Sequence, residues 1–172
     1  MRARLSFLIP FATLAVGCAA GPRAPARAPG SVGDVPLMAA DGRPIVLRDA
    51  LAQRPTLVSF WAPWCEPCVR ELPALERLSR AVTPCGAAVV GVAVGEKPAP
   101  TAAFARARGL DYAQLTDEPF ALVDALGQRR IPATVVFDAA GRVAFTGNAL
   151  DARAQAALAR ALGDAARRCT WP

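Results

Sequence analysis

Continuous apolar runs mark the interior strands of this chain. Thr56–Trp61 (TLVSFW), Ala87–Val94 (AAVVGVAV) and Ile131–Phe137 (IPATVVF) carry apolar side chains on both sides of the backbone. Such runs are typical of strands that are buried on both faces of a sheet. The turn residues Asp138–Gly141 predict that the third run is followed by a returning strand at Arg142–Thr146.

Helical periodicity and turn signals divide the chain around these strands. Apolar residues at spacings of three and four predict a helix from about Leu72 to Val82, and Thr83-Pro84 ends it. The remaining expected elements are a hairpin at Val35–Leu47 around Asp41-Gly42, helices at Thr101–Arg108 and Phe120–Leu126, a short strand near Tyr112–Leu115, and a last helix that is capped by Asn148 or Asp151 and runs to about Arg168. Alternating strands and helices predict an α/β sheet that is covered on both faces.

The N-terminus has the plan of a signal peptide. In residues 1–17, Arg2 and Arg4 precede an apolar run that is shorter than a membrane-spanning helix needs. Cys18 follows this run directly and resembles the cysteine of a bacterial lipobox, which is lipidated and becomes the new N-terminus. The alternative is cleavage near Ala20, which would leave a secreted protein.

Residues 18–31 are rich in Pro and Ala and have no apolar periodicity. Such a segment cannot bury a core, so it is expected to be a tether. Residues 32–172 are then expected to form one domain of ordinary size.

Composition excludes several kinds of function. The chain contains no histidine, which removes Cys-His and Ser-His-Asp catalysis and imidazole-ligated metals. The formal charge is +6, but the arginines are scattered and form no basic run. Because a nucleic-acid site requires a patch or stripe of basic residues, no nucleic-acid partner is expected.

The tetrapeptide Cys-Glu-Pro-Cys, at Cys65 to Cys68, could hold a metal, attach a haem, staple the fold or exchange disulfides. A c-type haem site needs His after the second cysteine, and Val69 stands there. A zinc site needs a second close pair, whereas Cys85 and Cys169 are isolated. A purely structural bond would close a very small loop and would constrain the unfolded chain little. Redox exchange is the favoured interpretation, with this disulfide in place of any bound cofactor.

The position of the pair assigns the two roles. Cys65 stands at the expected start of a helix, where unpaired amide groups and the helix dipole favour a thiolate. The reactive thiol of a Cys-x-x-Cys site has a pKa of about 3.5–7.5, below the pKa of about 8.5 of free cysteine. We therefore expect Cys65 to attack the partner and Cys68 to resolve the mixed disulfide. Pro67 suits the first turn because it has no amide hydrogen to lose.

Three motifs together resemble the thioredoxin superfamily. They are WCEPC, the Ile131–Thr134 segment (IPAT) and the Asp138 to Arg142 turn, and they are most similar to the membrane-tethered periplasmic branch typified by TlpA and ResA. The resemblance implies a thioredoxin-like fold: a central mixed sheet with helices on both faces and an added N-terminal hairpin. It also implies that Pro132 is a cis-proline facing the cysteines, which leaves the backbone of Ile131 free to pair with a partner peptide.

Two residues near the motif keep two interpretations each. Glu71 matches the acid that the ResA branch places beside its thiols and could relay the proton of Cys68, or it could merely favour the helix dipole. Trp64 could shield the site and contact the substrate, or it could be ordinary packing. Thioredoxins proper carry a buried Asp on the preceding strand, where this chain has Ser59.

Cys85 and Cys169 are expected to form a structural disulfide. Both continue apolar stripes, one just past the helix that begins near the motif and the other on the last helix. In a thioredoxin-like fold these helices lie on one face of the sheet, so their far ends should be neighbours. The alternative is two separate cysteines.

The favoured function is thiol–disulfide exchange in the bacterial cell envelope. The resemblance favours a reductant, with cytochrome c maturation as one candidate pathway, that receives electrons from a membrane donor and acts on thiol- or disulfide-bearing envelope proteins. The alternatives are an envelope disulfide oxidase or isomerase and a non-catalytic binding module.

Overall fold

The structure is a computed structural model and describes residues 31–172. The expected signal peptide at residues 1–17, the lipid site at Cys18 and nearly all of the tether lie outside these residues. Between residues 31 and 172, no helix is both long and apolar enough to cross a membrane.

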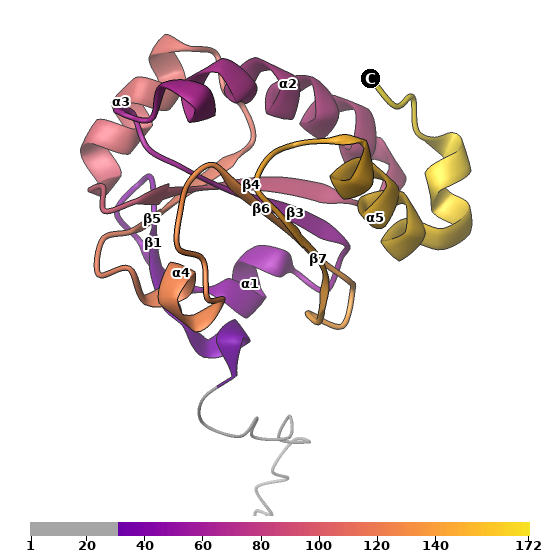
Figure 1. The fold of residues 1–172 in the computed structure, drawn as a ribbon, viewed down its shortest axis with the longest axis horizontal. Coiled ribbons are helices and arrows are strands. Elements are labelled where there is room, and N and C mark those ends of the chain that lie inside the picture. Colours follow the sequence, from indigo (N-terminus) through magenta and orange to yellow (C-terminus); the bar gives the residue numbers. More distant parts are fainter. Residues whose placement is uncertain (1–30) are drawn as a thin grey trace, which may run out of the picture.

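A seven-stranded mixed sheet forms the centre of the molecule (Figure 1). Its order is β2-β1-β5-β4-β3-β6-β7. The strands are β1 (Pro36–Ala39), β2 (Pro44–Val46), β3 (Thr56–Trp61), β4 (Ala88–Val94), β5 (Ala113–Asp117), β6 (Ala133–Phe137) and β7 (Val143–Gly147). β3 pairs in parallel with β4 and antiparallel with β6. The expected hairpin is present, and β1 also pairs with β5, so the hairpin extends the sheet.

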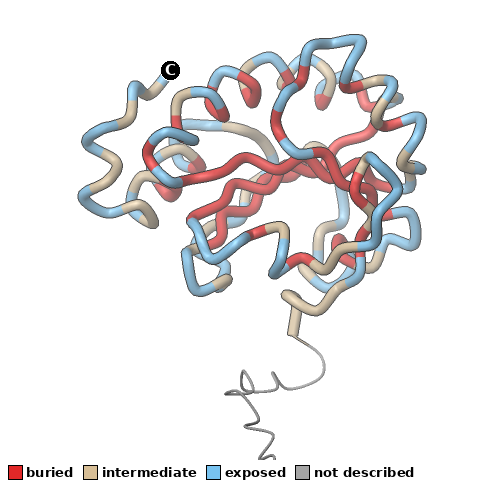
Figure 2. Tube along the Cα trace, turned by 180° about the vertical axis from the view of Figure 1, so that it is seen from behind, coloured by how far each residue is buried: buried red, intermediate tan, exposed pale blue. Residues whose placement is uncertain are grey.

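Helices cover both faces of this sheet, which confirms the predicted fold class. They are α1 (Leu47–Leu51), α2 (Glu66–Val82), α3 (Pro98–Ala107), α4 (Ala121–Ala125) and α5 (Ala152–Leu162). The residues of α2, α3 and α5 pack into one core cluster, and those of α1 and α4 pack into the cluster on the other face. In Figure 2 the central strands are a buried band between helices whose outer sides are exposed.

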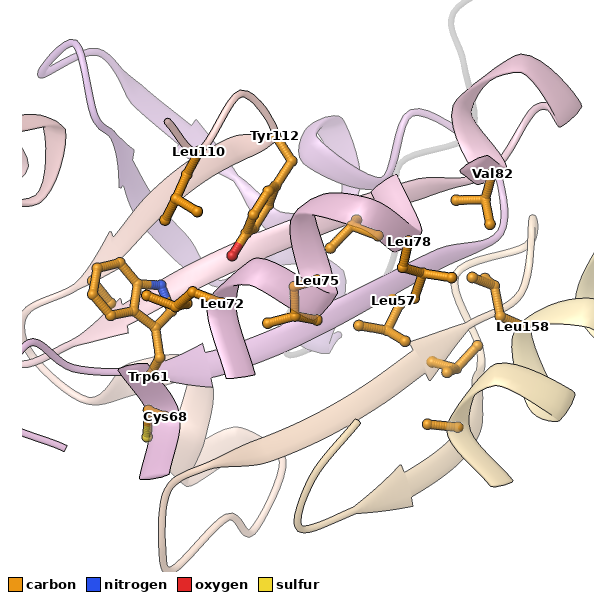
Figure 3. Close-up of a cluster of buried hydrophobic side chains, with 14 of the residues drawn as sticks. Leu57, Trp61, Cys68, Leu72, Leu75, Leu78, Val82, Leu110, Tyr112 and Leu158 are labelled. Carbon is orange, nitrogen blue, oxygen red and sulfur yellow. The ribbon is translucent and has the colours of Figure 1, made fainter. Parts of the chain in front are cut away.

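The apolar runs explain why β3 and β4 lie at the centre. Every residue of both strands is buried, as expected for strands with an apolar core on each side. Helix α2 buries its apolar stripe against them through Leu72, Leu75 and Leu78, which are at most 1% exposed. Figure 3 shows these leucines in a row that runs along the helix from Trp61 toward Leu158.

Several boundaries differ from the sequence predictions. The short helix α1 was not predicted, because five residues give too little periodicity to detect. Helix α3 begins at Pro98, three residues early, since proline fits a first turn. The last helix ends at Leu162 because Gly163 adopts a positive φ, and the chain continues as a 3-10 helix to Arg168. Strand β6 begins at Ala133 rather than at Ile131.

Candidate active site

Cys65 caps the amino-terminal end of α2. Its backbone is extended, and its Sγ accepts the N–H of Cys68 at 3.3 Å. Pro67 lies in the first turn, where a missing amide hydrogen costs nothing. The sulfur of Cys65 therefore lies at the positive end of α2, the longest helix among residues 31–172, within reach of a backbone donor.

The two cysteines form a disulfide whose Cα atoms are 5.2 Å apart. Cys65 is 5% exposed and Cys68 is 1% exposed, so Cys65 is the one nearer to solvent. Cys68 belongs to the same buried cluster as Trp61 and Leu72, and Figure 3 shows it at the end of that cluster. Cys65 belongs to this cluster too, so both cysteines border the core and Cys65 is the slightly more exposed of the two.

The loop before β6 carries a cis peptide bond between Ile131 and Pro132. β6 then pairs with β3, and the pairing of Ala133 with Phe60 places this loop beside the end of β3 that leads into the cysteines. Within residues 31–172 no strand pairs with Ile131. Its backbone therefore lies before the paired residues of β6, where an extended peptide could form backbone hydrogen bonds with it.

The two tryptophans near the motif have different environments. Trp61 is fully buried, and its Nε1 donates a hydrogen bond to Oε1 of Gln114 at 3.1 Å. Trp64 is 72% exposed and lines a cavity together with Phe120 and Ile131. Packing thus accounts for Trp61, whereas Trp64, directly before Cys65, is largely exposed, and its contact with a substrate stays a prediction.

Glu71 is half-buried and turned toward the loop before α5. Its Oε1 accepts the N–H of Leu150 at 2.6 Å, and its Oε2 is buried with no hydrogen-bond partner among the described residues. Burial raises the pKa of Glu71, the Leu150 hydrogen bond opposes that rise, and the charge of Asp151 adds to it. A carboxyl group in this environment can hold a proton more readily than an exposed glutamate can.

The structure adds Asp117 and Phe120 to the surroundings of the site. Asp117 is fully buried at the end of β5, and its Oδ2 accepts the N–H groups of Leu122 and Val123 at 3.0 Å each. Burial raises its pKa, and these bonds oppose the rise. Phe120 begins α4 with a φ of 62° and is 49% exposed. The sequence predicted a helix start here but gave no sign that Asp117 would be its buried cap.

Cys85 and Cys169 lie at the other end of α2. The structure joins them in a disulfide with Cα atoms 5.7 Å apart, within the usual range for a bridge. Cys85 ends the short 3-10 helix after α2, and Cys169 follows the one after α5. The far ends of α2 and α5 are therefore neighbours.

The sequence profile of the Redoxin family matches residues 19–162. The chain belongs to the Redoxin family. Within the thioredoxin superfamily it is a TlpA/ResA-like protein. The thiol-disulfide oxidoreductase ResA of Halalkalibacterium halodurans is 28% identical over 103 residues, which are 60% of this chain and 58% of that protein. The chain spans about half to three fifths of the length of the curated relatives it matches.

Solved structures share the fold. A thioredoxin-family thiol:disulfide interchange protein from Chlorobium tepidum is 26% identical with a TM-score of 0.61, and the match covers 76% of this chain and 96% of that one. A secreted Mycobacterium tuberculosis disulfide oxidoreductase homologous to E. coli DsbE is 22% identical with a TM-score of 0.63, and the match covers 75% and 97%. The second likeness concerns the fold alone.

Proposed function

We propose that this protein is a thiol–disulfide oxidoreductase of the bacterial cell envelope that reduces disulfides in partner proteins. The observation that carries the proposal is the position of the Cys65 sulfur at the start of α2, where it accepts the N–H of Cys68. In the reduced protein, that donor and the positive end of the helix would both stabilise a thiolate. The thiolate is the species that attacks a disulfide.

The difference in burial between the two cysteines supports different roles for them. The Cys65 thiolate attacks one sulfur of the partner's disulfide, and the other sulfur leaves as a thiolate. Cys68, which is 1% exposed and next in the same turn, then attacks Cys65 and releases the partner's second thiol. Two electrons pass from the dithiol to the partner, and the Cys65–Cys68 bond forms.

Glu71 supports the second step, in which Cys68 must lose a proton. It lies one helical turn after Cys68, and its buried Oε2 has no partner among residues 31–172. A carboxylate there can take the proton, and the pKa of Glu71, which burial raises, lets it hold that proton more readily than an exposed glutamate would.

The cellular setting is part of the proposal. A signal peptide at residues 1–17, lipidation at Cys18 and a tether at residues 18–31 would hold the domain at the outer face of a bacterial membrane. Its partners would be disulfide-bearing envelope proteins, including those of cytochrome c maturation, and a membrane donor would return electrons to Cys65–Cys68. The oxidising surroundings would let the Cys85–Cys169 disulfide persist as a structural bond.

Insulin reduction tests the activity. With dithiothreitol as the electron source, the soluble domain should speed the precipitation of insulin chains, whereas a non-catalytic binding module would not. The reduction potential tests the direction. A value near that of thioredoxin, about −270 mV, supports a reductant, and one near that of DsbA, about −120 mV, would contradict it in favour of an oxidase.

A further inference from the structure

A cavity of ≈ 500 Å³ opens between α4 and Ile131 and reaches Trp64, the residue directly before Cys65. Trp64 and Ile131 border it on the cysteine side, and Val94 and Val123 line it from the sheet and α4. Phe120 stands at its mouth. We call this cavity the α4 groove. Its volume is enough for a large apolar side chain with part of its own backbone.

Phe120 is held in the α4 groove by an unusual backbone. Its φ of 62° is rarely adopted by a bulky residue, and such strain concentrates where a side chain has a task. The ring lies against Gly95, where an added Cβ would come within 3.0 Å of the ring tip. The absence of a side chain at Gly95 makes room for the ring.

Asp117 fixes this conformation. Its carbonyl accepts the N–H groups of Phe120 at 3.3 Å and of Gly95 at 3.0 Å. Its carboxylate holds the N–H groups of Leu122 and Val123. A fully buried carboxyl group is costly unless it is bonded, so the two hydrogen bonds to Oδ2 are specific, whereas Oδ1 has no hydrogen-bond partner among the described residues. Together these hydrogen bonds leave the Phe120 ring half-exposed in the same cavity that Trp64 lines.

The rim of the α4 groove is basic. Arg129 and Arg130 line it just before Ile131, and both are exposed. Neither forms an ion pair with any residue from 31 to 172. Asp124 is the one acidic residue of the lining, so two positive charges face one negative charge. An occupant with a negative charge would complement this rim.

We propose that the α4 groove selects partners that carry a large apolar residue and an acidic residue close to their reactive cysteine. The apolar side chain would lie between Trp64 and Phe120, and the acid would meet Arg129 and Arg130. The backbone between them would pair with Ile131, which has no strand partner in the described part of the chain. The inference rests on the proposed function and adds to it the class of substrate.

Activated peptides test this selection. Short peptides with one cysteine are linked to thiopyridine through a disulfide, and they differ only in an acidic, neutral or basic residue or in an apolar residue replaced by serine. The reduced protein attacks the peptide sulfur and releases pyridine thiolate, which is followed by absorbance. We expect acidic peptides to react faster than basic ones on the order of tenfold at low salt, with the ratio falling as salt rises.

Charge reversal locates the effect. In Arg129→Glu/Arg130→Glu the order of the acidic and basic peptides should invert. The matched control is Arg54→Glu/Arg77→Glu, which changes the net charge equally at exposed arginines outside the lining and should keep the wild-type order. If both double variants change the ratio equally, the effect belongs to net charge and the proposal is wrong.

Truncation tests the apolar contact. Phe120→Ala should lower the preference for the apolar over the serine peptide about fourfold, which corresponds to the loss of one buried methylene group. Val143→Ala, at an exposed apolar residue of β7, should leave that preference unchanged.

Insulin reduction distinguishes a failure of the proposed function from a failure of the proposed selection by the α4 groove. If insulin is reduced but all peptides react alike, the groove selects nothing and only this inference fails. If the peptides are discriminated but insulin is not reduced, the proposed function fails and the binding preference stands.

Discussion

The two ends of α2 carry the same chemical group in opposite settings. At the amino-terminal end, the Sγ of Cys65 accepts the N–H of Cys68 and lies at the positive end of the dipole. At the carboxyl-terminal end, Cys85 follows the last turn, where carbonyl groups and the negative end of the dipole oppose a thiolate. One helix thus favours a reactive sulfur at one end and an unreactive one at the other.

The loops that the two disulfides close differ just as much. Cys65 and Cys68 are 3 residues apart, whereas Cys85 and Cys169 are 84 apart. The entropy that a bond removes from the unfolded chain grows with the loop it closes. The short bond can therefore open and close with little effect on the fold, while the long bond restrains the C-terminal segment.

The largest expected effect follows from breaking the amino-terminal pair. Cys65→Ser should reduce insulin reduction to the rate without protein, because the remaining sulfur of the pair, that of Cys68, belongs to a residue that is only 1% exposed and does not cap the helix. Cys68→Ser should still attack and should accumulate mixed disulfides, which non-reducing electrophoresis and mass spectrometry detect.

Alkylation of the fully reduced protein checks this assignment of roles. Cys65 should be modified first, since it is more exposed and better placed to ionise. Faster modification of Cys68 would reverse the two roles.

The next effect concerns stability. For the Cys85→Ser/Cys169→Ser variant, with the Cys65–Cys68 bond kept oxidised, the chain-entropy treatment gives a loss of about 4–5 kcal/mol in unfolding free energy. Urea unfolding measures it, and insulin reduction in the absence of denaturant should change little.

The single variants Cys85→Ser and Cys169→Ser are the matched controls, and each should lose about as much as the double variant. If the double variant is as stable as the parent while its activity falls, the disulfide at the carboxyl-terminal end of α2 is not structural, and the contrast between the two ends of the helix is wrong.

The sequence was a good guide to the fold where patterns were long. β3 and α2 were predicted because continuous and periodic apolar residues extend over many positions. It failed at α1, which has five residues, and at the end of α5, where Gly163 stops a pattern that continues to Arg168. Local periodicity cannot register contacts that decide such short segments.

The candidate active site likewise contains residues that the sequence identifies and residues that only the structure reveals. Cys65, Cys68 and Pro132 stand in a motif and could be named from the sequence, and the structure places them at one edge of the sheet. Asp117 and Phe120 belong to no motif, and their role depends on a buried carboxylate and a positive φ. Only the folded chain brings Gly95 under the ring of Phe120.

The smallest expected effect concerns two partly or fully buried glutamates of α2, which differ in their hydrogen bonds. Glu76 is satisfied, because its Oε1 accepts from Arg80 and its Oε2 accepts the N–H of Asp111. Glu71 has one satisfied oxygen and one buried oxygen without a partner among the described residues. The first ties α2 to the rest of the fold, whereas the second is free to exchange a proton.

Glu71→Gln should therefore change the pH dependence of exchange without unfolding the domain. Burial raises the pKa of Glu71 above its ordinary value of 4.5, so the folded protein binds this proton more tightly than the unfolded chain does. The free energy of unfolding therefore falls as the pH rises from 4.5 through the raised pKa. The Gln variant lacks that loss, so its unfolding free energy relative to the parent should rise across the same window. Decay of the mixed disulfide should accelerate in the parent as Glu71 ionises, and in the variant only at higher pH, where Cys68 ionises unaided. Glu118→Gln, at an exposed glutamate outside the motif, is the control and should follow the parent. Coincident profiles for Glu71→Gln and the parent would make Glu71 a structural residue like Glu76.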